Sequence, residues 1–167
     1  INGKDFSDEE EGYVGSVRDY FLAQSNGQFE LDFDVVGPVT MSKNYGYYGN
    51  DGAYQKDEKV YEMIKEACDG IKDQVNLKNY DWDGDGEADQ VFFLYAGLGQ
   101  ASGGSAGTIW PHESELRYWP CGVLSYPTGK INTYACANEL QPETQGSSRY
   151  ISAGIGTICH EFSHCLG

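Results

Sequence analysis

The sequence predicts an α+β fold, with an α/β-like alternation of helices and strands, in a single domain of residues 1–167. Three observations carry this prediction. Residues 60–75 repeat apolar side chains at helical spacing, and residues 91–96 form a short apolar run typical of a strand. Residues 155–166 then form a second amphipathic helical segment.

Composition and charge narrow the class of protein. Apolar residues make up 40% and aromatic residues 14% of the 167 residues, enough to build a packed core. The 26 acidic and 11 basic residues leave a net charge of -15, which repels nucleic acid and anionic lipid. The longest apolar run is far shorter than the roughly 20 residues of a membrane span. We therefore expect a globular protein with no nucleic-acid partner and no membrane span.

A helix and a strand are predicted first along the chain. Residues 7–10, Ser-Asp-Glu-Glu, form a capping box, and Val17 and Phe21 follow at helical spacing until residues 26–27, Asn-Gly, end the run. Residues 29–35 alternate apolar and acidic side chains, and this period of two predicts a strand with one buried face.

A long helix and a central strand come next. The unbroken apolar run at 91–96 predicts a strand covered on both faces. The Gly/Ser-rich loop at 97–107 is a weak match to a nucleotide-binding pattern, and no helix follows it to point its N-terminus at a phosphate. We therefore set nucleotide binding aside. The helical stripe consists of Val60, Ile64, Ala67, Ile71 and Val75.

The second half of the chain predicts a short strand at 108–110, ended by Pro111, and a hairpin at 116–140 that turns at residues 127–130. Cys121 and Cys136 are equidistant from the centre of that turn. A hairpin in this register places them opposite each other, at a distance that a disulfide could bridge. The alternative is a pair of half-buried thiols.

The last predicted helix carries the pattern His-Glu-Phe-Ser-His at residues 160–164. Residues four apart share one helix face, so His160 and His164 can direct both imidazoles at one metal ion. Glu161 lies beside them, where a carboxylate can take the proton of a zinc-activated water. The apolar arc on the other side of this helix consists of Ile155, Ile158, Phe162, Cys165 and Leu166.

Catalytic zinc usually has three protein ligands, and the chain has one further histidine, His112. A lone histidine just after a strand end is more often a surface or hydrogen-bonding residue than a ligand. His112 therefore remains an alternative for the third ligand and not the preferred one.

The acidic loop at residues 81–89 has the spacing of a calcium loop, with Gly86 at the sharp-turn position. Phe92 stands where an EF-hand has its bidentate glutamate, so the loop is EF-like without being an EF-hand. A solvated acidic turn is the alternative. Crowded carboxylates repel one another without a cation, which favours calcium. The predicted calcium ligands are Asp81, Asp83, Asp85, Glu87 and Asp89.

Several stretches together resemble one known family. Residues 160–167, His-Glu-Phe-Ser-His-Cys-Leu-Gly, are similar to the first eight positions of the HExxHxxGxxD pattern of immune inhibitor A-like zinc metallopeptidases. The resemblance extends to "GSVRDYF" at 15–21, "DWDGDGEADQVFFLYAG" at 81–97 and "IWPHE" at 109–113. It spans most of the chain.

This resemblance implies a secreted zinc endopeptidase of the zincin type, with a twisted, mainly β sheet, backing helices and an active-site helix. It implies that His160 and His164 bind zinc, that Glu161 is the catalytic base, and that the acidic loop holds a structural ion. It also implies an Asp ligand three residues beyond Gly167. We therefore expect a catalytic subdomain that is incomplete at both ends, and an isolated chain that is inactive for lack of the third ligand.

The leading hypothesis is a zinc-dependent endopeptidase that acts on extracellular proteins or peptides. An edge strand binds the substrate backbone in such folds. The strand predicted for this role consists of Thr108, Ile109 and Trp110. The alternative hypothesis is a calcium-dependent binding or adhesion module with a non-catalytic metal site.

Overall fold

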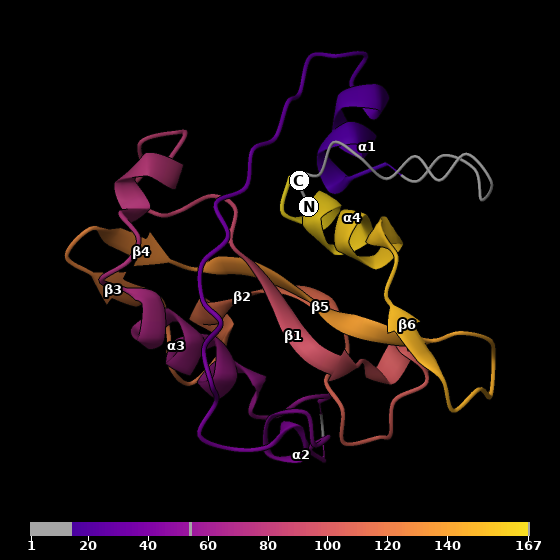
Figure 1. Cartoon of the computed structure of the whole chain (residues 1–167). Helices are drawn as coiled ribbons and strands as arrows, with labels where there is room; N and C mark the ends of the chain where they lie inside the picture. Colours follow the sequence, from indigo (N-terminus) through magenta and orange to yellow (C-terminus); the bar gives the residue numbers. More distant parts are fainter. Residues whose placement is uncertain (1–14, 54, 167) are drawn as a thin grey trace.

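A computed structural model describes residues 15–53 and 55–166 of the chain and confirms a mixed arrangement of helices and strands (Figure 1). Among these residues no helix has the length and hydropathy that a bilayer span requires. The helices are α1 (Val17–Gln24), α2 (Tyr45–Tyr48), α3 (Val60–Ile71) and α4 (Ile155–His164), with short 3-10 turns η1 (Leu77–Tyr80), η2 (Gln100–Ser102) and η3 (Leu116–Tyr118). The strands are β1 (Phe92–Leu98), β2 (His112–Glu115), β3 (Leu124–Tyr126), β4 (Gly129–Ile131), β5 (Thr133–Pro142) and β6 (Tyr150–Ser152).

The main sheet is built around β5. Strand β1 pairs with β5 in parallel and β2 pairs with it antiparallel, so the order is β1-β5-β2, and β6 pairs with the far end of β5. Alternate residues of β5 supply two separate cores. Tyr134 and Cys136 belong to the core that includes α3, whereas Ala137 packs with α1 and α4. Helices α3 and α4 therefore cover opposite faces of the sheet (Figure 1).

Helix α3 confirms the predicted amphipathic helix, although it ends at Ile71 and not near Val75. Val60, Ile64 and Cys68 lie one turn apart and are at most 1% exposed. This spacing of four residues brings them to one face, where they pack against the sheet.

Helix α1 confirms the first predicted helix over the residues that the structure describes. Its N-cap is Ser16, which forms a capping box with Asp19. The helix ends before Asn26 and Gly27, whose φ angles of 52° and 79° are left-handed. The capping box predicted at residues 7–10 lies outside the described residues.

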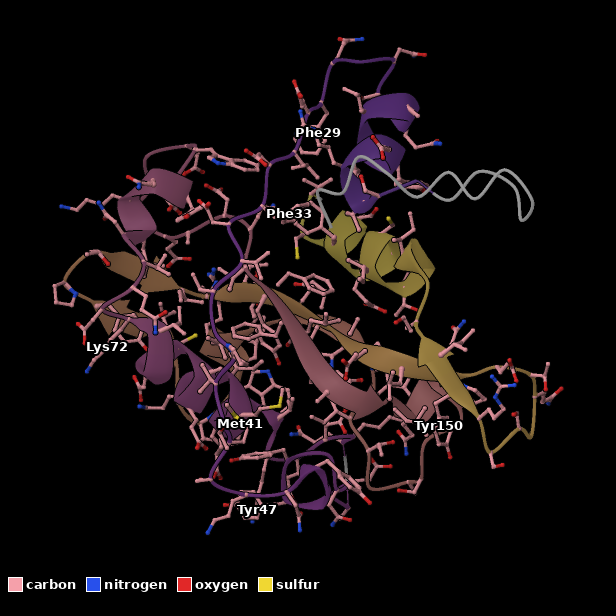
Figure 2. The ribbon with its side chains drawn as sticks, in the orientation of Figure 1. Phe29, Phe33, Met41, Tyr47, Lys72 and Tyr150 are labelled. Atoms are coloured by element: carbon pink, nitrogen blue, oxygen red, sulfur yellow. The ribbon has the colours of Figure 1, made fainter. Side chains whose placement is uncertain are left out.

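The strand predicted at residues 29–35 is wrong, because this segment is extended but pairs with no described strand. Its alternation nevertheless identifies the side chains that pack. Leu31 is 5% exposed, and Phe29 and Phe33 pack into the core shared by α1 and α4 (Figure 2). Val35, at the end of the alternation, is 77% exposed. The segment is therefore held by side-chain contacts to α1 and α4, and not by hydrogen bonds to a neighbouring strand.

Strand β1 confirms the predicted strand, but the prediction that it is central is wrong, because β5 holds that position in the order β1-β5-β2. Within the described residues it pairs with β5 alone, and Leu94 is 52% exposed. Phe93 packs on the α3 side and Phe92 on the α4 side. The expectation of full cover on both faces is therefore wrong at Leu94.

The strand predicted at Thr108–Trp110 is also wrong, since the strand begins after Pro111, as β2. Backbone groups of the predicted segment have partners other than a strand. The Ile109 carbonyl accepts from the Gln100 N–H at 3.0 Å and the Tyr95 hydroxyl at 2.8 Å, and the Trp110 N–H donates to Asp57 at 2.8 Å. Proline ends the irregular segment, and the ladder starts with the next residue.

The predicted hairpin is confirmed only near its turn. Strands β3 and β4 pair, and the pair Tyr126 and Gly129 closes a two-residue turn. The chain then leaves this hairpin, because β5 pairs with β1 and β2. Cys136 consequently lies opposite His112 and not opposite Cys121, and both cysteines are free thiols. The predicted disulfide between Cys121 and Cys136 is wrong for this reason.

Candidate metal centre

Helix α4 buries apolar side chains against α1, the extended segment at residues 29–35 and strand β5. Ile158, Cys159 and Phe162 are at most 8% exposed, and the Phe162 ring lies 5.4 Å from the ring centroids of both Phe21 and Phe33. The predicted apolar arc is confirmed except at its end, since the helix stops at His164 and Leu166 is 41% exposed. Packing against β5 and α1 thus fixes how α4 is rotated.

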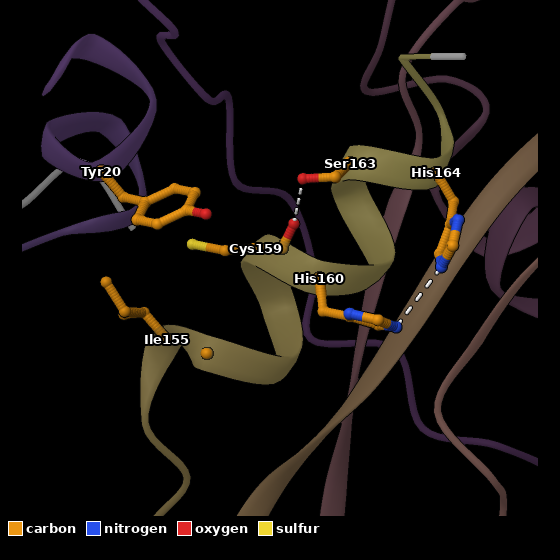
Figure 3. A pocket seen from close by; sticks show the side chains of 7 residues that line it. Tyr20, Ile155, Cys159, His160, Ser163 and His164 are labelled. Atoms are coloured by element: carbon orange, nitrogen blue, oxygen red, sulfur yellow. Dashed lines mark hydrogen bonds between the residues drawn. The ribbon is translucent and has the colours of Figure 1, made fainter. Parts of the chain in front are cut away.

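That rotation leaves His160 and His164 exposed, one turn apart. Their Nε2 atoms face each other at 3.3 Å (Figure 3). Two nitrogens that bind one tetrahedral zinc at 2.0–2.1 Å are themselves about 3.3 Å apart. The pair therefore already has the separation that a shared ion requires.

Glu161 completes the cluster. Its side chain is buried to 9% exposure, and its carboxylate lies within 4.8 Å of the ligand nitrogens of His160 and His164. Burial raises the pKa of Glu161, while the two histidines and the backbone N–H of Glu113 lower it. The cluster combines two neutral nitrogen donors with a carboxylate, which suits a borderline-soft ion such as zinc.

Strand β2 contacts α4 and brings a residue to the centre that sequence reasoning missed. Glu113 pairs with Ala135, on the α4 face of the sheet. Its charge raises the pKa of Cys165, and its backbone N–H lowers the pKa of Glu161. Successive side chains of a strand point to opposite faces, so a strand placed at residues 112–115 would have put Glu113 and His112 on different faces of the sheet.

His112 is not part of this centre. It lies on the other face of β2, where Nδ1 donates to the Trp110 carbonyl at 2.6 Å and Nε2 bonds the Tyr134 hydroxyl at 2.8 Å. Burial lowers the pKa of His112. The interpretation as a hydrogen-bonding residue is confirmed, and the alternative of a third ligand is wrong because the sheet separates His112 from α4.

The predicted substrate strand is not beside the centre either. Ile109 belongs to the core under α3, and Thr108 is 8% exposed. Trp110 lines a small cavity on the α3 side together with Asp57, His112 and others. These three residues therefore do not lie at the metal centre.

The solvent-facing side of α4 borders a hollow of about 370 Å³ between α1 and α4 (Figure 3). Cys159 points toward Tyr20 across this hollow, while both histidine rings lie on its border. The two imidazoles project from the side of α4 that is opposite Tyr20, and both histidines are exposed to solvent (Figure 3).

The acidic loop gathers three of its five predicted ligands. Carboxylate oxygens of Asp81, Asp83 and Asp85 lie within 4.8 Å of one another. Glu87 lies instead 4.0 Å from the Arg117 guanidinium, and Asp89 accepts the Trp82 N–H at 2.6 Å. The structure therefore brings the first three aspartates together and does not place Glu87 and Asp89 with them.

Comparison with known proteins adds the family. A family model described as "Immune inhibitor A peptidase M6, catalytic domain" matches residues 1–167. The pre-pro-metalloprotease PrtV of Vibrio cholerae serotype O1 (strain M66-2) is 29% identical over 192 residues, which cover 97% of this chain and 20% of the relative. Immune inhibitor A of Bacillus thuringiensis subsp. alesti is 26% identical over 189 residues, which cover 97% of this chain and 26% of the relative.

The chain thus spans about a fifth to a quarter of the length of these relatives. The family match covers both the sheet and α4, including the cluster of His160, Glu161 and His164. The chain therefore belongs to the immune inhibitor A peptidase M6 family, in the part that forms its catalytic domain.

Proposed function

We propose that this chain supplies the metal-binding helix and the catalytic base of a zinc-dependent endopeptidase that hydrolyses extracellular proteins. The observation that carries the proposal is the 3.3 Å separation of the His160 and His164 Nε2 atoms. The buried carboxylate of Glu161 beside them supplies a group that can act as the general base in hydrolysis. Membership of a peptidase family that has a metalloprotease among its relatives supports the same reaction.

Each residue of the cluster has a distinct role in this proposal. His160 and His164 hold the ion through Nε2, so both imidazoles are neutral when it is bound. Zinc, when bound, acts as a Lewis acid toward the scissile carbonyl and lowers the pKa of a water molecule. The Glu161 carboxylate accepts the proton of the attacking water and then donates it to the leaving amine.

The substrate backbone needs a strand to pair with, and β2 takes this role in place of residues 108–110. The Leu116 N–H donates to the Asn132 carbonyl at 2.8 Å, so alternation in the antiparallel ladder turns the N–H and C=O of Glu113 away from β5. Within the described residues no strand pairs with that edge of β2. An extended peptide added there would pass next to Glu161.

The third protein ligand is proposed to come from outside the described residues. Within them, the only carboxylate grouped with His160 and His164 is that of Glu161, which is assigned to proton transfer. Residues 1–167 alone should therefore bind zinc weakly and hydrolyse peptides slowly.

A calcium ion in the acidic loop is a second element of the proposal. It is supported by the convergence of Asp81, Asp83 and Asp85, because a cation bound between carboxylates at this separation offsets their mutual repulsion. Its role is structural, since the loop connects η1 to β1 and its aspartates form a group separate from His160, Glu161 and His164. Secretion is also proposed, and the pre-pro designation in the name of a relative supports it.

The decisive experiment uses the full-length protein with Glu161→Gln and His160→Ala. We expect Glu161→Gln to keep stoichiometric zinc and to lose about 10²- to 10⁴-fold in kcat, because the amide cannot accept a proton. His160→Ala should lose the ion itself. Metal content by mass spectrometry and cleavage of a quenched fluorescent peptide measure both. A wild-type rate in Glu161→Gln would contradict the assignment of the base.

A further inference from the structure

Glu113 occupies a special position on β2. Its partner in the ladder is Ala135, so its side chain lies on the face of the sheet that α4 covers. Neighbouring charges act on it from this side. Its pKa is raised by burial and by the carboxylates of Glu115 and Glu161, and lowered by His164. The carboxylate is thus within electrostatic range of the metal cluster and on the strand proposed to bind substrate.

Among the neighbouring charges only His164 stabilises the Glu113 carboxylate, and it does so without direct contact. In the described part of the chain its carboxylate has neither a salt bridge nor a hydrogen bond. Glu115, two residues along on the same face, differs in this respect, since its Oε2 lies 2.7 Å from the Arg117 Nε. A partly buried carboxylate without a partner loses hydration and gains no ion pair in return. A cationic group supplied by a ligand would provide that missing partner.

The ligand that fits is a basic side chain of the bound peptide. An extended chain beside β2 places its side chains alternately on the two faces of the sheet, so one residue near the scissile bond faces Glu113. A Lys or Arg there pairs with the carboxylate, whereas an acidic residue meets both Glu113 and Glu161. The net charge of -15 over the whole chain also attracts basic peptides.

We infer that Glu113 is a specificity-determining residue, whose carboxylate binds a Lys or Arg side chain of the substrate at a residue flanking the scissile bond. This inference rests on the proposed endopeptidase function. It assigns the side chain of Glu113 a role separate from that of its backbone, which pairs with the peptide regardless of sequence.

The test compares peptides that carry lysine, norleucine or glutamate at the positions flanking the cleaved bond, with the zinc-loaded full-length protein as enzyme. Norleucine has nearly the length of lysine without its charge. We expect wild type to prefer lysine over norleucine in kcat/KM, and Glu113→Gln to reduce that ratio on the order of tenfold, the loss of one charged hydrogen bond. Glu115→Gln is the matched control and should leave the ratio unchanged, because Arg117 already neutralises Glu115.

Charge reversal gives a second, independent measurement. Glu113→Lys should reverse the preference, so that the glutamate peptide is cleaved faster than the lysine peptide. An unchanged lysine-to-norleucine ratio in Glu113→Gln overturns the inference. Loss of zinc from Glu113→Gln also overturns it, because Glu113 would then be a metal ligand. Wild-type protein that binds zinc but cleaves none of the peptides would instead contradict the proposed function.

Discussion

At the residue scale, Asp57 is the buried charge that the catalytic proposal does not use. It is 3% exposed, and its Oδ2 accepts the Trp110 N–H at 2.8 Å, while Oδ1 has no hydrogen-bond partner among the described residues. Burial, with a smaller contribution from Asp51, raises its pKa to about 6. The bond to Trp110 ties the loop before α3 to the segment that leads into β2.

The raised pKa of Asp57 makes the stability of the fold depend on pH. The folded protein holds the Asp57 proton more tightly than the unfolded chain, so this residue stabilises the fold most below about pH 4, and that stabilisation is lost as the pH rises through 6. Asp57→Asn keeps an acceptor for Trp110 and tolerates the left-handed φ of 49°. We expect the variant to gain stability relative to wild type as the pH rises from 4 to 7. The Tm values of both proteins across this pH range measure the difference in stability. A difference in Tm that does not change with pH would contradict the prediction.

At the element scale, α4 depends on the aromatic contacts that set its rotation. Phe162 is 1% exposed and contacts Phe21 of α1 and Phe33 of the extended segment. Phe162→Ala should therefore destabilise the fold by about 3–5 kcal/mol, the usual cost of removing a buried aromatic ring. Val35→Ala is the control, since its side chain is 77% exposed and should change stability by less than about 0.5 kcal/mol. Urea unfolding curves give the free energy of unfolding of both variants. Equal losses of stability in the two would contradict the role of Phe162 in holding α4 against α1 and residues 29–35.

The same contacts explain why residues 29–35 look like a strand. A backbone that alternates its side chains can bury one face against helices as well as against a sheet. The period of two reports burial on one side and contains no information about a hydrogen-bonded partner. Leu31 and Phe33 satisfy the pattern by packing toward α1 and α4.

At the scale of the whole molecule, the acidic loop is connected to the rest of the fold. Its Gly86 carbonyl accepts the Lys130 N–H of β4 at 3.0 Å, and Ala88, which is 2% exposed, donates back to Lys130 at 2.9 Å. A cation that binds only the folded loop stabilises by mass action, by about 2.7 kcal/mol at one hundred times its Kd. Saturating calcium should therefore raise the Tm of the whole chain, by about 5 °C or more.

Calcium titrations of Asp83→Asn and of Asp73→Asn test this expectation by scanning calorimetry. Asp83 belongs to the cluster of aspartates, whereas Asp73 is an exposed carboxylate outside the loop. Asp83→Asn should lose most of the calcium-dependent rise, and Asp73→Asn should keep it. A Tm indifferent to calcium and chelator in wild type would reduce the loop to a solvated acidic turn.

The sequence by itself determined the features that local geometry controls. The four-residue spacing of His160 and His164 places both imidazoles on one face of any α-helix, and Glu161 follows from the same helix. Helix α3, strand β1 and the turn of the β3-β4 hairpin likewise follow from patterns within a few neighbouring residues. The helix and turn predictions hold because helical and turn geometry are complete without the rest of the chain, and β1 was recognisable from its apolar run alone.

Only the tertiary structure decided which distant segments meet. The register of β2 on β5 directs Glu113 toward α4 and His112 away from it, although the two residues are adjacent in sequence. The same pairing separates Cys121 from Cys136. A strand exchanges its two faces with a shift of a single residue, so small errors in its predicted limits invert every contact it makes. Partner choice depends on the packing of the whole sheet, which no short pattern contains.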